Sequence, residues 1–108
     1  MRSSLFLTKV EQAPDNLLFR FSLAQALYQE NNYEEACEHL QVCCDGRKDW
    51  MLAKILLGKS LLALGKTDDA RPVLQAALAL AIEQNHDDPA DELRTLLAAD
   101  TASKQTGP

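Results

Sequence analysis

The residues best able to do chemistry lie within eight positions: Cys37, His39, Cys43 and Cys44. Thiolates and imidazoles are preferred zinc ligands, and on a helix residues four positions apart, such as His39 and Cys43, share a face. These two could therefore reach one metal ion. A structural zinc site needs four ligands, however, and the other two cysteines lie elsewhere on the helix surface. We therefore expect no metal, a small core residue at Cys43, and only partial exposure of Cys37 and Cys44.

The remaining titratable groups do not form a recognisable catalytic set. His86 stands beside Asp87 and Asp88, in a segment that we interpret as a solvated turn. Acidic residues such as Glu34 and Glu35 stand at an expected helix start and are interpreted as its solvated face. The sequence has no Ser/His/Asp order, no phosphate-binding glycine loop and no carboxylate pair suited to burial. We therefore predict neither an enzyme nor a cofactor.

Composition and charge narrow the possible partners. The chain has 108 residues, enough for one domain, with 16 acidic and 11 basic residues and a formal charge of −5. The basic residues are scattered, so a nucleic-acid partner is not expected. No apolar run approaches the roughly 20 residues that span a bilayer, so a membrane is not expected either. An odd number of cysteines and no recognisable secretion signal favour a reducing cytoplasmic location.

The chain repeats itself with a period of 34 residues. Leu17–Trp50 aligns with Met51–Gln84 without a gap. The identical pairs are Leu18 and Leu52, Leu23 and Leu57, Leu27 and Leu61, Ala36 and Ala70, Leu40 and Leu74, and Gln41 and Gln75. Most of these positions are ones at which the two helices of a hairpin must pack. The period therefore predicts two tandem helix–turn–helix units, repeat one at about 17–50 and repeat two at about 51–84.

Local signals predict where these helices begin and end. Asp15 or Asn16 can cap a first helix that runs to about residue 29, and Asn32 has the capping-box spacing to the glutamate three residues on. The dipeptide Asn31-Asn32 and the segment around Gly65 are expected to turn, because asparagine and glycine tolerate left-handed backbone. Gly46 is expected just past the end of the second helix.

Two flanking helices complete the expected domain. Ser3 or Ser4 can cap a short N-terminal helix, and Pro89 is suited to the first turn of a capping helix at about 89–98. The predicted architecture is all-α, a right-handed superhelical stack of helix–turn–helix repeats forming a single domain over residues 1–100. Residues 101–108 lack an apolar period and are expected to form a disordered tail.

The repeats resemble the tetratricopeptide repeat family, and the layout resembles its small stand-alone bacterial two-repeat members. The motif residues in repeat one are Arg20, Leu23, Ala24, Leu27, Ala36 and Leu40. Those in repeat two are Lys54, Leu57, Gly58, Leu61, Ala70 and Leu74. Arg20 and Lys54 replace the usual large aromatic residue of the motif. The resemblance implies closely packed hairpins, with small residues at the close contacts and leucines between the helices.

A second apolar stripe remains on the first helix of each repeat, and we refer to it as the stripe. It comprises Leu18, Phe21, Gln25, Tyr28, Leu52, Ile55, Lys59 and Leu62. The family resemblance implies that these residues line a concave groove that holds a peptide or helical segment of a protein partner. We therefore predict a protein–protein interaction module, or adaptor.

Two alternatives remain open from the sequence. In the first, the C-terminal helix folds back over the stripe, which is then ordinary core. In the second, the stripe pairs two copies of the chain as a homodimer. Clamping of a chaperone's C-terminal carboxylate is not expected, because the positions that would form the clamp are Phe21, Gln25 and Leu56.

Overall fold

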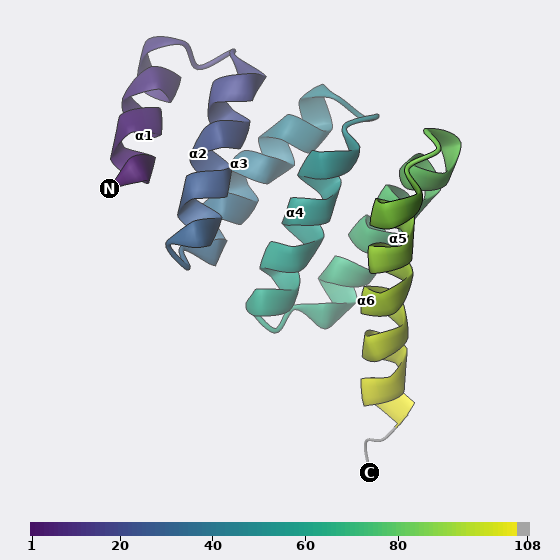
Figure 1. Ribbon diagram of the computed structural model, residues 1–108. Helices are drawn as coiled ribbons and strands as arrows, with labels where there is room; N and C mark the ends of the chain where they lie inside the picture. Colours follow the sequence, from purple (N-terminus) through teal and green to yellow (C-terminus); the bar gives the residue numbers. More distant parts are fainter. Residues whose placement is uncertain (106–108) are drawn as a thin grey trace.

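The computed structural model describes residues 1–105, with side chains described to residue 99. Within that range every regular element is an α-helix (Figure 1). The helices are α1 (Arg2–Gln12), α2 (Leu17–Gln29), α3 (Tyr33–Gly46), α4 (Met51–Ala63), α5 (Thr67–Glu83) and α6 (Asp87–Gln105). Leu, Ala, Gln and Glu are common in these segments, and such residues lose little side-chain freedom in a helix.

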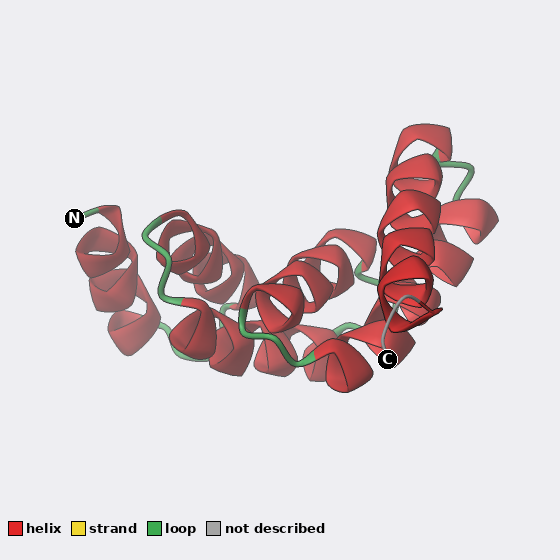
Figure 2. Ribbon diagram, turned by 90° about the horizontal axis from the view of Figure 1, so that it is seen from below, coloured by secondary structure: helices red, strands yellow, loops and turns green. Residues whose placement is uncertain are grey.

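Each helix packs mainly against its neighbours in the chain, in antiparallel pairs. The two repeats are the hairpins α2–α3 and α4–α5, flanked by α1 and α6. The helices form a curved row with α1 at one end and α6 at the other (Figure 2). The expected all-α architecture of tandem helix–turn–helix repeats is therefore confirmed. None of the described helices is long and apolar enough to cross a membrane.

The hairpins close over small residues, as the repeat pattern predicts. Ala24, Ala36 and Ala70 are fully buried. Gly58 allows the closest approach, since a Cβ atom placed there would lie 2.7 Å from the Cγ atom of Leu74. The alanine or glycine at each contact lets the helices approach, and the buried leucines fill the space between them.

The turns within both repeats use left-handed backbone, as expected. Asn31 has φ 66° and Gly65 has φ 76°. Just beyond each, a backbone N–H closes the helix end: that of Asn32 donates to Leu27 O at 2.8 Å and that of Lys66 to Leu61 O at 2.9 Å. The two turns therefore share one helix-ending motif built on different residues.

Two of the side-chain caps expected at helix starts differ from the structure. Asn16 caps α2 by accepting from the Phe19 N–H at 3.1 Å, as predicted. Asn32 makes no side-chain cap, so the predicted capping box is wrong. Helix α1 begins at Arg2 rather than after a serine cap, and Ser3 Oγ donates to a Glu30 carboxylate oxygen at 2.6 Å. This bond ties α1 to the end of α2.

Gly46 serves a different purpose from the one predicted. It is the last residue of α3, and its backbone is not left-handed. A Cβ atom there would lie 2.6 Å from the Cδ1 atom of Leu17. Its lack of a side chain therefore allows α3 to approach α2.

The last helix is longer than expected. Helix α6 runs from Asp87 to Gln105, whereas the sequence suggested a capping helix over 89–98 and a tail from Thr101. Part of the expected tail is therefore helical. Positions 106–108 of it lie outside the described residues.

Candidate functional site: the stripe face of α2 and α4

The stripe residues differ in exposure. Leu18 and Leu52 are 62% and 54% exposed, and Gln25 is also exposed. Tyr28, Lys59 and Leu62 are half-buried. Because Leu18 and Leu52 occupy equivalent places in neighbouring helices, they leave matched apolar side chains open to solvent.

The other two apolar stripe residues contribute to the core. Phe21 is half-buried and its ring lies 4.9 Å from that of Trp50, at an interplanar angle of 44°. Ile55 is only 9% exposed and packs in a cluster with Ala90 and Leu93 of α6. The stripe is thus open at Leu18 and Leu52 and covered at Ile55, with Phe21 partly covered.

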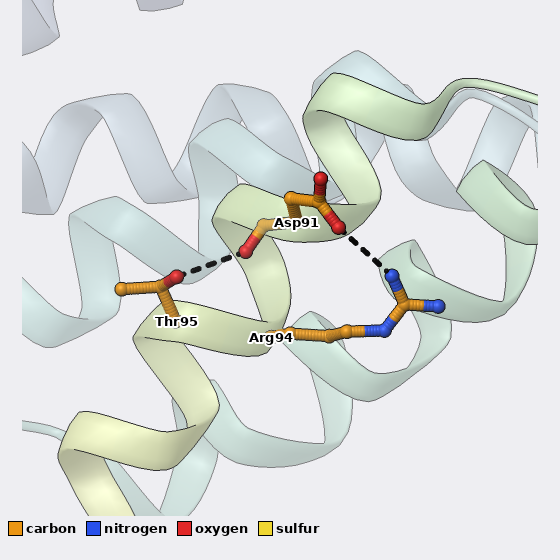
Figure 3. A network of polar contacts seen from close by, with 3 residues as sticks. All are labelled: Asp91, Arg94 and Thr95. Carbon is orange, nitrogen blue, oxygen red and sulfur yellow. Dashed lines mark hydrogen bonds and ion pairs between the residues drawn. The ribbon is translucent and has the colours of Figure 1, made fainter.

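A charged contact joins α6 to α4. Lys59 of the stripe forms an ion pair with Glu92 of α6. Further along α6, the Arg94 guanidinium bonds Asp91 at 3.1 Å and the Thr95 hydroxyl donates to Asp91 O at 3.0 Å (Figure 3). These three side chains are exposed. The helix therefore packs one face on the repeats and presents polar groups at the end of the row.

A cavity of about 660 Å³ continues from the exposed end of the stripe. Leu52 lines it together with Trp50 and Leu80, which are half-buried. The Arg47 guanidinium lies 4.8 Å from the centre of the Trp50 ring, within the range of a cation–π contact. The cavity thus lies where the loop before α4 meets the end of α5 and the start of α6.

Two of the three cysteines, Cys43 and Cys44, are core residues. Cys43 is fully buried, as expected, and burial raises the pKa of its thiol to about 11. Its Sγ atom lies 3.6 Å from Leu17 O, to which the thiol can donate. Cys44 was expected to be partly exposed but is buried, and burial also raises its pKa. In the described part of the chain, no three histidine, cysteine or acidic side chains are grouped as a metal site.

His39 takes part in a polar bridge that the sequence did not suggest. Arg20 Nη1 lies 3.1 Å from His39 Nδ1, and Arg20 Nη2 donates to Pro14 O at 3.0 Å. Because a guanidinium can only donate, His39 Nδ1 accepts the bond and the imidazole is neutral. Burial, and then the charge of Arg20, lower the pKa of His39 below its ordinary 6.5.

Comparisons with known proteins agree with this architecture. Residues 4–77 match the family model described as "Anaphase-promoting complex, cyclosome, subunit 3". The chain belongs to this tetratricopeptide-like repeat family. Proteins of this kind are generally protein–protein interaction modules and are typically not catalysts.

Individual proteins similar to the chain include the following two. One is the TPR repeat-containing protein PA0015 of Pseudomonas aeruginosa, 36% identical over 67 residues. The match spans 62% of this chain and 64% of that relative, a little under two thirds of its length. The other is protein BPP2914 from Bordetella parapertussis, whose solution structure superposes with a TM-score of 0.81. It is 24% identical, with 95% of this chain and 90% of that one covered, and so it supports the fold alone.

Two features of the site could not be anticipated from the periodicity. These are the tilted ring contact between Trp50 and Phe21 and the cavity lined by Trp50. The one available signal was the single tryptophan of the chain, which precedes the second repeat in a loop with Arg47. An isolated aromatic residue in a loop does not reveal which distant helices lie beside it.

Proposed function

We propose that this protein is an adaptor that holds an apolar peptide or helical segment of a partner protein against the stripe face of α2 and α4. The observation that carries the proposal is the matched exposure of Leu18 and Leu52, at 62% and 54%, one repeat apart. Apolar side chains exposed at the same position of successive repeats can form an interaction surface. Gln25, also exposed on this face, can add hydrogen bonds to a bound backbone.

The proposal is tested by replacing both leucines with glutamate, Leu18→Glu with Leu52→Glu. A charged side chain at an exposed site stays hydrated, so the fold should be kept, whereas a partner's apolar segment should lose its main anchors. A matched control is Leu5→Glu with Ile82→Glu, which changes two leucine-sized residues that are 69% and 53% exposed on other helices.

The readout is capture of proteins from a lysate of the source cell by immobilised parent and variants, quantified by mass spectrometry. A partner retained by the parent and the control, and lost by the Leu18/Leu52 variant, supports the proposal. Equal capture by all three would refute it. Light scattering is run on the same samples, because a parent dimer that the Leu18/Leu52 variant dissociates would favour self-association instead.

A further inference from the structure

The cavity beside the stripe has an apolar floor and an acidic wall. Trp50, Leu52 and Leu80 supply apolar surface, while Asp49 and Glu83 line it with carboxylates. At about 660 Å³ it is large enough for one long side chain and the backbone around it. It therefore has both the size and the mixed lining of a side-chain pocket.

Two contacts hold the walls of the cavity in place. The Trp50 ring packs against Phe21 in a tilted arrangement, with 4.9 Å between the ring centres. The Gln84 side-chain amide donates to Asp49 O at 3.1 Å, which ties the end of α5 to the loop before α4. A pocket whose walls are already fixed loses less conformational freedom when it binds.

The charge around the cavity favours a cation. The carboxylates of Asp49 and Glu83 have no ion pair or hydrogen bond with any other described residue, and Asp87 and Asp88 follow at the start of α6. The lining also contains His86 and Arg47, and the Arg47 guanidinium lies over the Trp50 ring. The cavity thus already accommodates one guanidinium and keeps unpaired carboxylates beside it.

We infer that this cavity takes a lysine or arginine side chain of the bound segment, next to an apolar residue that contacts Leu52. The inference rests on the proposed function, because Leu52 belongs to both the stripe and the cavity. The methylene stem of the basic side chain would lie on Trp50 and Leu80, and its charged end would reach the carboxylates of Asp49 and Glu83. The partner is thus a basic and apolar segment rather than an acidic one.

The test uses short defined probes and the single tryptophan of the chain. Because Trp50 lines the cavity, its fluorescence reports occupancy. N-acetyl-leucyl-arginine amide and N-acetyl-leucyl-glutamate amide are titrated separately at low salt. The arginine probe should bind roughly tenfold more tightly, as expected for two partly exposed ion pairs, and salt should weaken it.

The decisive variant is Asp49→Asn with Glu83→Gln, which should abolish the preference for arginine. Glu11→Gln with Glu34→Gln is the matched control, since it removes the same charge from exposed sites on α1 and α3 and should keep the preference. Equal binding of both probes to the parent, tighter binding of the glutamate probe through Arg47, or an unchanged preference in the decisive variant would each overturn the inference. Failure of the adaptor proposal is recognised separately, by capture that does not depend on Leu18 and Leu52.

Discussion

The two repeats have equivalent stripe residues in different surroundings. Leu18 and Leu52 are exposed to similar extents, 62% and 54%. Phe21 and Ile55 also correspond, yet Phe21 packs on Trp50 in the loop before α4, and Ile55 belongs to a buried cluster with residues of α5 and α6. The same position of the two repeats is thus covered by different elements. A residue's place in the repeat sets the direction of its side chain, and the neighbouring element decides its burial.

The repeats also reach the same close packing by different residues. Ala24 is fully buried with its methyl group accommodated, whereas Gly58, at the equivalent position, has no room for one because of Leu74. The difference shows that each hairpin is fitted to its own leucines. A small residue is required at this position, but how small depends on the partner helix.

A polar bridge is present in repeat one and has no equivalent in repeat two. Arg20 bonds His39 in the first repeat. The corresponding residues in the second are Lys54 and Val73, and valine cannot accept a hydrogen bond. Repeat one therefore contains a titratable contact that could make its stability depend on pH, and repeat two does not.

The largest effect is expected where two adjacent stripe residues of α4 differ in burial. Ile55→Glu should lower the free energy of unfolding by at least about 3 kcal/mol, because it removes a buried side chain and forces a carboxylate into the apolar cluster shared with α5 and α6. Leu52→Glu, one turn away and exposed, should change it by less than about 0.5 kcal/mol. Urea denaturation followed by circular dichroism measures both. If both variants were equally stable, Ile55 would not be buried against α5 and α6 in solution.

A smaller effect is expected from substitutions at the small residue of each hairpin, Gly58 in repeat two and Ala24 in repeat one. Gly58→Ala gains about 1 kcal/mol of helix propensity but overpacks Leu74, which costs about 1–3 kcal/mol, so a net destabilisation of about 1 kcal/mol is expected. The reciprocal Ala24→Gly should also destabilise by about 1 kcal/mol, through lost propensity. Thermal melts test both. An increase in stability for Gly58→Ala would mean that α4 and α5 can separate at no cost.

The smallest effect should be the pH dependence of repeat one. His39 has a lowered pKa when folded, so the unfolded chain takes up the proton more readily. The stabilising contribution is therefore complete above pH 6.5 and is lost as the pH falls through the lowered folded pKa. Arg20 favours the neutral ring, while Glu35 and Glu38 oppose it.

His39→Gln, which keeps an acceptor that does not titrate, should flatten this loss of stability. The exposed His86→Gln is the control and should follow the parent. Urea midpoints at several pH values below neutrality provide the measurement. If the stability of the His39 variant fell with pH as steeply as that of the parent, the bridge would not contribute to stability.

The sequence by itself determined the repeat, the helices and the hairpin contacts. A 34-residue period places leucines and small residues on one face of each helix, and residues such as Asn31 and Gly65 mark the turns, since these signals act within one hairpin. Caps were less predictable. Asn32 and Ser3 both have side chains suited to capping, but Asn32 makes no cap, and Ser3 bonds Glu30 at the end of α2.

Only the tertiary structure decided which stripe residues stay exposed and where the cavity lies. Helical periodicity assigned Leu52 and Ile55 to one stripe, yet Ile55 is buried in a cluster that α4 forms with α5 and with α6, whose first residue is more than 30 positions further along. The cavity likewise needs the loop carrying Trp50 to meet the ends of α5 and α6. Burial depends on every element that surrounds a side chain, and contacts between distant elements leave no period in the sequence.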